Sequence, residues 1–357
     1  MTTDRIWRSE EQAVFALREL YQRYGYAPYK MSQFEEYDLY VRNKDFLISD
    51  KIITFSGEGG KLMALKPDVT LSIVKNAPEE PGVVQKVYYS ENVYRDYREI
   101  MQAGLECVGD LTQYDIAETV LLAVKSLDAL GGRYVLNISH MGLLAAVLER
   151  CGFQQDQQKQ AMVCLRQKNP HDLKALCGDH EDAWETLNAI SACRGGVDAL
   201  EALTPYLTGE AELTAVEELK ALLGMLTERG YQETVRMDFS VSNDLGYYSG
   251  VVFRGYLEGI PESILSGGQY DKLPRKMGRK SRAIGFAVYA DLLQERSRED
   301  SSFDVDTLIL HDGTVSLSEV NRAAKAASKN GSVLVATMPP KGRSWKNLVT
   351  LKGGAAQ

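Results

Sequence analysis

The stretch that most constrains the fold is residues 83–108, which have the pattern of two strands joined by a very short link. Val83–Tyr94 is rich in β-branched and aromatic residues, as strands are, and Glu99–Val108 alternates well enough to be a second strand. The link of residues 95–98 has room only for a tight turn. The sequence therefore predicts a β-hairpin here.

Polar residues interrupt this hairpin at positions 95, 98, 102 and 106. Because side chains alternate along a strand, Arg98, Gln102 and Glu106 are expected to project from one face. A sheet face with an arginine, an amide and a carboxylate among apolar neighbours can hold a small zwitterion. The alternative is a solvated outer face, which is the commoner role of such residues in an isolated hairpin.

Composition places the chain among ordinary globular proteins, with 44% hydrophobic and 25% charged residues over 357 positions. Its apolar runs are too short to span a bilayer, and the first residues contain no apolar segment typical of a secretory signal. A net charge of −8 argues against a broad nucleic-acid surface. We expect a cytoplasmic protein with no membrane and no nucleic-acid partner.

Cysteine and histidine usage gives no sign of a metal site. The five cysteines contain no CxxC pair, and an odd number without a signal indicates reduced, structural thiols. The four histidines are scattered along the chain. We therefore expect neither a metal nor a cofactor.

Capping residues and glycines divide the chain into predicted helices and strands. A capping-box start at Ser9–Gln12 opens a periodic helix that Gly25 ends. Asp45–Phe55 and Lys61–Leu65 are expected to be strands, and Asp115–Glu118 is expected to cap a long helix that ends at residues 131–132. Further strands are predicted at residues 133–138, 234–240, 245–256 and 262–268.

Residues 140–232 differ from this pattern because they are rich in Leu, Ala, Glu, Gln and Lys. We interpret them as a helical insertion between two halves of one core, residues 1–139 and 233–296. Residues 305–357 are expected to form a small α/β segment, with a helix at 316–329 among strands at 306–310, 332–337 and 346–352. The fold class predicted is α+β.

Several segments, in order, resemble motifs of histidyl-tRNA synthetases and their non-catalytic relatives. Residues 91–110 (ENVYRDYREIMQAGLECVGD) resemble motif 2, and residues 65–70 (LKPDVT) resemble Leu-Arg-Pro-Asp/Glu-x-Thr. Residues 243–250 (NDLGYYSG) resemble the histidine-specific signature, residues 267–273 resemble Gly-Gly-Arg-Tyr-Asp-x-Leu, and residues 282–287 resemble the start of motif 3. The resemblance implies a class II synthetase-like fold, in which helices flank a mixed, mainly antiparallel sheet.

The same resemblance implies a ligand pocket for histidine or a similar amino acid. In the family, the residues that match Asp68, Thr70 and Gln102 hold the α-amino group, and those that match Glu106 and Tyr248 hold the imidazole. Arg95 matches an arginine that reaches the carboxylate, and Tyr247 pairs with Tyr248 in the signature. Without a ligand, Asp68 also suits a helix start and the two tyrosines suit strand packing. Residues 24–40 loosely resemble motif 1, which builds the dimer interface of the family, so self-association is expected.

Three parts of the family's adenylation machinery are missing. The loop of motif 2 is reduced to Asp96 and Tyr97, the arginine of motif 3 falls on Leu292, and the arginine that opens the signature falls on Asn243. The loss of one preorganised charge-stabilising donor typically costs about 10²–10³-fold in rate. We therefore expect no catalytic residues and no adenylation.

A synthetase-like core of this kind resembles the regulatory subunits of ATP phosphoribosyltransferase. These non-catalytic proteins assemble with a short catalytic subunit, which makes phosphoribosyl-ATP in the first step of histidine biosynthesis, and histidine feeds back on the complex as its effector. The resemblance implies the same partner and effector here. The alternatives are a divergent histidyl-tRNA synthetase and a histidine-binding paralogue with another partner.

Overall fold

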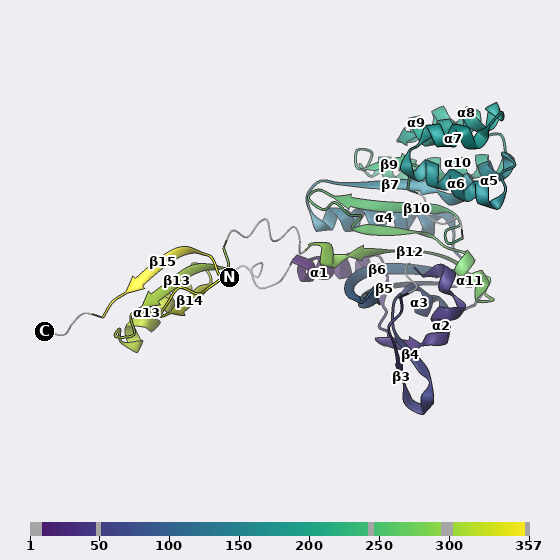
Figure 1. Ribbon diagram of the computed structural model, residues 1–357. Coiled ribbons are helices and arrows are strands. Elements are labelled where there is room, and N and C mark those ends of the chain that lie inside the picture. Colours follow the sequence, from purple (N-terminus) through teal and green to yellow (C-terminus); the bar gives the residue numbers. More distant parts are fainter. Residues whose placement is uncertain (1–8, 48–50, 242–245, 294–302, 354–357) are drawn as a thin grey trace. The chain divides into compact units, whose positions relative to one another are not determined.

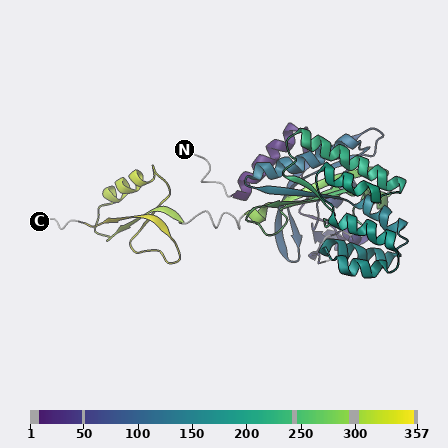
Figure 2. The same ribbon diagram turned by 90° about the horizontal axis from the view of Figure 1, so that it is seen from above.

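The computed structural model describes residues 9–47, 51–241, 246–293 and 303–353. The chain divides into two compact units, residues 1–293 and residues 294–357 (Figures 1 and 2). Asn243, which matches the arginine that opens the histidine-specific signature, lies outside the described residues.

The first unit is built on a nine-stranded, mainly antiparallel sheet, in the order β1-β5-β6-β12-β11-β10-β7-β9-β8 (Figure 1). In this order the strands are Ala27–Pro28, Val84–Arg95, Arg98–Gly109, Arg282–Tyr289, Leu265–Gln269, Val251–Leu257, Tyr134–His140, Val235–Asp238 and Arg194–Gly195. Within the described strands of this sheet, the pairs β1–β5 and β7–β9 are parallel and the others antiparallel. The predicted α+β class with a mainly antiparallel sheet is confirmed.

The hairpin predicted at residues 83–108 is the pair β5–β6, whose strands match residue for residue from Val84↔Gly109 to Arg95↔Arg98. Asp96 and Tyr97 form the turn, with φ of 50° and 62°. Positive φ at both central residues is the geometry of a two-residue type I′ turn, which suits the twist of the two strands.

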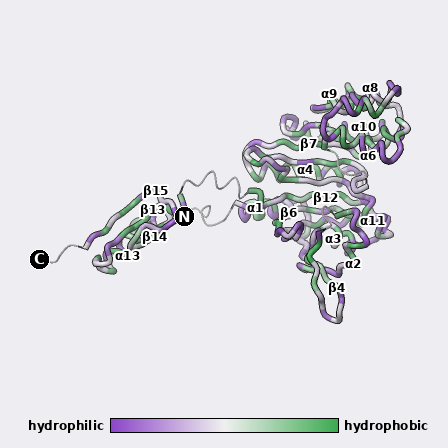
Figure 3. Tube along the Cα trace, in the orientation of Figure 1, coloured by the Kyte–Doolittle hydropathy of each residue, from purple (hydrophilic) through white to green (hydrophobic). Residues whose placement is uncertain are grey.

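Helices cover both faces of this sheet. On one face α1 (Ser9–Arg23), α4 (Gln113–Leu130), α5 (Met141–Arg150) and α10 (Glu210–Glu228) enclose the larger apolar core. On the other face α2 (Tyr37–Arg42), α3 (Thr70–Asn76) and α11 (Lys272–Lys276) enclose a smaller core. Helix α4 and strand β12 are hydrophobic along much of their length (Figure 3).

One predicted helix start is wrong in detail. Thr112, rather than the segment Asp115–Glu118, is the N-cap of α4, and Asp115 is the third residue of a capping box with it. The side chain of Thr112 accepts from the backbone N–H of Asp115, and the Asp115 carboxylate accepts from the backbone N–H of Thr112 at 2.9 Å.

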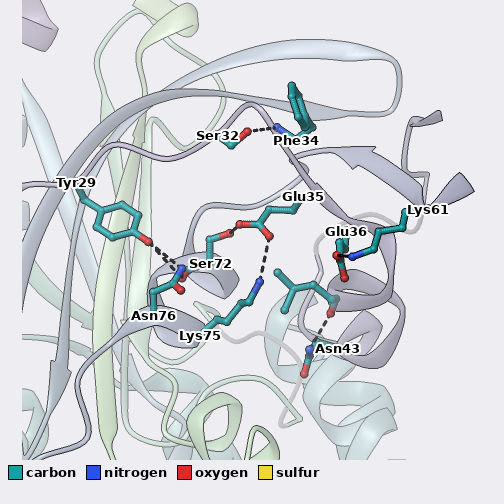
Figure 4. Close-up of polar contacts among 11 residues, drawn as sticks. Tyr29, Ser32, Phe34, Glu35, Glu36, Asn43, Lys61, Ser72, Lys75 and Asn76 are labelled. Atoms are coloured by element: carbon teal, nitrogen blue, oxygen red, sulfur yellow. Dashed lines mark hydrogen bonds and ion pairs between the residues drawn. The ribbon is translucent and has the colours of Figure 1, made fainter. Parts of the chain in front are cut away.

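A second small sheet, in the order β2-β4-β3, forms an arm next to α3 (Figure 1). Its strands are Phe34–Glu36, Leu62–Leu65 and Thr54–Ser56. The strand predicted at residues 45–55 is therefore wrong over most of its length, because residues 44–46 form a 3-10 turn and only residues 54–56 pair with β4. Figure 4 shows how Glu35 of β2 joins the arm to α3: its carboxylate accepts from Ser72 at 3.3 Å and from Lys75 at 3.2 Å.

The helices predicted for residues 140–232 are present, and they belong to the same compact unit as the sheet. Between α5 and α10 they are α6 (Gln155–Gln167), α7 (Pro170–Cys177), α8 (Glu181–Ala192) and α9 (Val197–Leu203). The division into a core and an inserted segment stays a proposal based on chain order.

The second unit has the elements predicted for it. A parallel sheet in the order β14-β13-β15 (Val333–Ala336, Val305–His311, Trp345–Leu351) carries one helix, α13 (Leu317–Ala327). Among the described residues of the whole chain, no helix is long and apolar enough to cross a membrane.

Candidate functional site

All seven residues predicted to contact a ligand line one small cavity in the first unit. They are Asp68, Thr70, Arg95, Gln102, Glu106, Tyr247 and Tyr248. The cavity has a volume of about 50 Å³. Segments far apart in sequence meet here, namely the start of α3, the hairpin β5–β6, the residues before β10, and strands β11 and β12. The role of these residues as ligand contacts stays a prediction.

The polar residues of β6 do not form a solvated face. Gln102 and Glu106 are buried, so the solvated alternative is wrong for them. Arg98 was expected beside them, but it is exposed at the turn and does not line the cavity. The guanidinium of the site comes instead from Arg95 at the end of β5, which is buried.

Glu106 is the centre of the hydrogen-bond network in the cavity. Its Oε1 accepts from the Thr70 hydroxyl at 2.9 Å, and its Oε2 accepts from the Tyr270 hydroxyl. Burial raises the pKa of Glu106 to about 8; the bonds from Tyr270 and Thr70 oppose this shift, and the nearby Asp68 adds to it. The empty pocket therefore holds Glu106 largely protonated at neutral pH.

Strand β12 makes room for this carboxylate. Gly285 lies directly opposite Glu106 in the β6–β12 register. A Cβ at position 285 would lie 1.7 Å from Glu106 Oε2, so any side chain there would displace the carboxylate. Close approach explains the glycine, since its φ lies outside the left-handed region.

Asp68 and Arg95 form the second polar group of the pocket. Asp68 Oδ1 accepts from the backbone N–H of Leu71 at 2.9 Å, so the expected helix-start role is real and coexists with its place in the cavity. Arg95 Nη2 lies 3.7 Å from Asp68 Oδ2, and Arg95 Nε donates to the Pro67 carbonyl at 2.6 Å. Burial nevertheless raises the pKa of Asp68 above its usual value, against the effect of Arg95.

Gln102 has a buried donor that nothing in the described part of the chain satisfies. Its Nε2 makes no hydrogen bond there. A buried polar group without a partner costs about 1–3 kcal/mol. A ligand acceptor at this point would remove that cost, which makes Gln102 the clearest sign that the cavity is built for an occupant.

The signature tyrosines form an aromatic wall outside the sheet. The strand predicted at residues 245–256 begins only at Val251, so the interpretation of these tyrosines as strand residues is wrong. The Tyr247 and Tyr248 rings lie 4.6 Å apart between centroids, and the Tyr247 and Tyr270 rings lie 6.0 Å apart. The three rings therefore pack against one another in tilted or edge-to-face contacts along one side of the cavity.

Sequence reasoning missed some members of the site. Tyr270 bonds Glu106, yet no role was given to it although its segment, residues 267–273, was recognised. Tyr89 of β5 and Tyr289 of β12 also line the cavity. Their signal was limited to strand alternation, which shows only that a side chain faces one side of a sheet.

Two adenylation features that the sequence predicts to be missing, the long loop of motif 2 and the arginine of motif 3, do not contribute to this cavity. The β5–β6 turn consists of two residues and does not line it. Leu292 packs against the larger apolar core. The cavity therefore holds the predicted ligand contacts, while the two-residue turn and Leu292 do not contribute to it.

Comparisons with known proteins agree with this architecture. The fold is that of a class II synthetase, and a family model described as Histidyl-tRNA synthetase matches residues 3–293. The chain belongs to this family.

Its relatives include proteins named as regulatory subunits. A protein of Acetivibrio thermocellus named ATP phosphoribosyltransferase regulatory subunit is 24% identical over 83% of this chain and 75% of its own length. The resemblance to such subunits, predicted from the motifs, is confirmed.

Solved structures show the same fold. An ATP phosphoribosyltransferase regulatory subunit/histidyl-tRNA synthetase from Bacillus halodurans aligns with a TM-score of 0.71 and 22% identity, over 97% of this chain and 95% of that one. A chain of the ATP phosphoribosyl transferase (HisG:HisZ) complex from Thermotoga maritima aligns with a TM-score of 0.62 and 19% identity, over 78% and 96%.

Proposed function

We propose that this chain is the non-catalytic regulatory subunit of an ATP phosphoribosyltransferase, acts in the cytoplasm, and binds histidine as the feedback effector of the complex. One observation carries the proposal. The cavity brings together every predicted amino-acid contact, while Leu292 and the two-residue turn leave it without two expected adenylation features. The names of its relatives support the role in histidine biosynthesis.

The chemistry of the pocket supports histidine as the ligand. The carboxyl groups of Asp68 and Glu106 lie in the pocket with one guanidinium, and burial raises the pKa of both carboxyls, so the site favours a ligand whose donor or cationic groups can take the place of a carboxyl proton. Hydrogen bonds to charged groups are worth about 1.5–3 kcal/mol each. A site built on such bonds rejects analogues that lack the partner groups.

Regulation would follow from linkage between this pocket and the catalytic partner. Histidine shifts the complex towards a less active state only by as much as it binds that state more tightly. The partner we propose is a short catalytic subunit, in keeping with the complex from Thermotoga maritima.

We propose that two copies of the chain associate through the arm. Phe34 and Phe55 are exposed on one face of the arm, because their partners on β4, Leu65 and Met63, are two residues apart, and their rings lie 5.7 Å apart between centroids. Exposed apolar groups gathered on one face are typical of an interaction surface. The arm also contains part of the segment that resembles motif 1.

Reconstitution tests the proposal. The chain is mixed with the short catalytic subunit of the same organism, and phosphoribosyl-ATP formation is followed with and without histidine. We expect activity that depends on this chain and falls with histidine. The double variant Asp68→Ala, Glu106→Ala should still activate but should lose inhibition by about 100-fold in histidine concentration.

A matched control is Glu99→Ala on the same strand, because Glu99 is exposed and lies outside the cavity. It should behave like the wild type. Catalytic activity that is indifferent to the chain would overturn the regulatory role. Inhibition that survives the double variant would place the effector elsewhere.

The family match favours one other candidate, a divergent histidyl-tRNA synthetase. Histidine-dependent exchange of pyrophosphate into ATP separates the two. We expect no exchange above background, because each missing charge-stabilising donor lowers the rate by about 10²–10³-fold. Measurable exchange would favour the synthetase.

A further inference from the structure

A second cavity lies between α4, α10 and the sheet, and the proposed function does not use it. Its apolar walls include Ile116 and Ala117 of α4, Leu219 and Leu222 of α10, and Val251 of β10. Leu219, Leu222 and Val251 belong to the larger core, whereas Tyr270 of the histidine-type pocket belongs to the smaller one. The two cavities therefore belong to different layers of the fold.

Two buried polar side chains line this cavity. His140, at the end of β7, and Gln269, at the end of β11, are each 6% exposed. Buried polar groups are expected to have partners. Within the described chain His140 has a partner at each ring nitrogen, whereas the side chain of Gln269 is only partly engaged. Their existing bonds show which atoms are left for a ligand.

The imidazole of His140 is fixed at both nitrogens. Its Nδ1 accepts from the backbone N–H of Leu143 at 3.0 Å, so the proton is on Nε2. Nε2 lies 3.4 Å from Glu218 Oε2. The hydrogen bond from His140 lowers the pKa of Glu218, with a smaller effect of Arg282, so Glu218 presents an ionised carboxylate to the cavity.

The amide of Gln269 is fixed on one side. Its Nε2 donates to Asp271 Oδ2 at 2.6 Å, which leaves the amide oxygen as the group available to a ligand. Together with Glu218, this oxygen makes the polar end of the cavity rich in hydrogen-bond acceptors.

Two glycines make room for these polar side chains. A Cβ at Gly250 would lie 2.2 Å from Gln269 Oε1, and a Cβ at Gly142 would lie 3.0 Å from His140 Cε1. Neither glycine has a φ in the left-handed region, so close approach is what requires them. The backbone is therefore shaped around the two groups that line the cavity.

The volume of the cavity limits its occupant to one ring. It measures about 160 Å³, and an apolar protein cavity of about 150 Å³ is known to hold benzene. We propose that this cavity binds a monocyclic nitrogen heteroaromatic compound whose amino or ring N–H groups donate to Glu218 and Gln269. The ring would pack between the apolar side chains of α4 and α10.

The test titrates 4-aminopyrimidine into the full chain and follows binding by saturation-transfer NMR. Ala221 lines the cavity from α10, and Ala211 is an exposed alanine on the same helix that does not line it. Ala221→Phe should weaken binding by about tenfold or more, because the phenyl ring takes the space of the ligand. Ala211→Phe should bind like the wild type. Ala117→Phe, from the opposite wall, repeats the test if the first variant folds poorly.

The design also separates this cavity from the histidine-type pocket, which is necessary because Gln269 and Tyr270 are neighbours in sequence. Glu106→Gln should leave binding of 4-aminopyrimidine unchanged. Loss of binding in Glu106→Gln, equal binding in Ala221→Phe and Ala211→Phe, or no saturable binding would each overturn the proposal. Benzene that binds as tightly as 4-aminopyrimidine would overturn the role of the acceptors.

Discussion

The two ends of the hairpin β5–β6 differ in almost every respect that matters for function. At one end Gln102 and Glu106 are buried in a shared cavity, and Glu106 accepts two side-chain hydrogen bonds. At the other end Asp96 and Tyr97 form an exposed two-residue turn, and Tyr97 is 80% exposed. In the synthetase family the first end holds the amino acid and the second carries the loop over ATP. Under the function proposed above, recognition of an amino acid would be retained on this pair of strands without its activation.

Burial explains why the recognition end is sensitive to small changes. Charges and hydrogen bonds act more strongly where water is excluded, and groups left unpaired there cost more. At the exposed turn the same changes are compensated by solvent. The predictions below test this difference, beginning with the largest expected effect.

Replacement of Gly285 by alanine should have the largest effect on histidine binding. The new Cβ would lie 1.7 Å from Glu106 Oε2, so the carboxylate must move and lose its bonds to Thr70 and Tyr270. We expect histidine affinity to fall by about 100-fold and the free energy of unfolding to fall by about 1–3 kcal/mol. Calorimetric titration and thermal unfolding measure the two effects.

Gly224→Ala is the matched control for this substitution. Gly224 lies within α10, and a Cβ there would meet no atom within 4 Å. Alanine in a helix interior is favoured over glycine by about 1 kcal/mol, so this variant should be more stable and bind normally. Normal histidine binding by Gly285→Ala would show that Glu106 does not recognise the ligand.

Histidine affinity should follow a bell-shaped pH profile. The pKa of Glu106 in the empty pocket is raised to about 8, and that of a free imidazole is about 6.5. Between these values Glu106 and the ligand together hold one proton, which is what their hydrogen bond requires. Below about pH 6.5 one proton must leave on binding, and above about pH 8 one must be taken up, so affinity should fall about tenfold per pH unit on each side.

The stability of the empty protein has its own pH dependence at this residue. A carboxyl with a raised pKa holds its proton more tightly in the folded chain than in the unfolded chain. Its contribution is complete below the ordinary glutamate pKa of about 4.3 and is lost as the pH rises through about 8. Glu106→Gln should remove this loss and flatten the alkaline side of the binding profile. An unchanged profile in Glu106→Gln would assign the titration to another group.

Prediction from the sequence succeeded where the pattern was local, and where several family motifs follow one another in the expected order. The hairpin β5–β6 followed from a short link between β-rich segments, and the pocket residues followed from several segments in the family's order. It failed where contacts between distant segments determine strand formation and burial. Residues 44–46 form a 3-10 turn, so a strand-like composition did not give a strand there, and Gln102 is buried in a cavity that residues of α3, β11 and β12 also line.

The second cavity shows the same limit. His140 was one of several scattered histidines, and nothing near it in sequence indicates Glu218 or Gln269 as neighbours. Residues 131–209 separate helices α4 and α10 in the sequence, and only the packed structure brings their faces together.

Gln102→Leu should make stability and binding change in opposite directions. The side chain is buried, and within the described chain its Nε2 has no hydrogen-bond partner. Removal of an unsatisfied buried donor should raise the free energy of unfolding of the empty protein by about 1 kcal/mol. Loss of the contact with a ligand acceptor should weaken histidine binding by about tenfold.

A second unpartnered amide on the same sheet provides the control for Gln102. Oε1 of Gln85 on β5 also makes no hydrogen bond in the described chain, and Gln85 does not line the pocket. Gln85→Leu should change stability in the same direction without altering affinity. If Gln102→Leu also bound normally, the unsatisfied donor would be a structural defect and not a ligand contact.

The smallest effect is expected at the turn. Tyr97 holds a φ of 62°, which is unfavourable for a residue with a side chain, and its ring is mostly exposed. Tyr97→Gly creates an Asp-Gly pair, which is preferred in type I′ turns, and should raise the free energy of unfolding by about 0.5–1 kcal/mol. Chemical denaturation measures this gain.

Asp96→Gly is the matched change at the other central residue of the turn. Asp96 also forms an ion pair with Lys51 at 3.5 Å, so its replacement should bring little net gain. Aspartate also tolerates positive φ better than tyrosine does. Neither variant should alter histidine affinity, because neither residue lines the cavity. If Tyr97→Gly weakened binding by more than about threefold, the turn would belong to the recognition site, and the two ends of the hairpin would not be functionally separate.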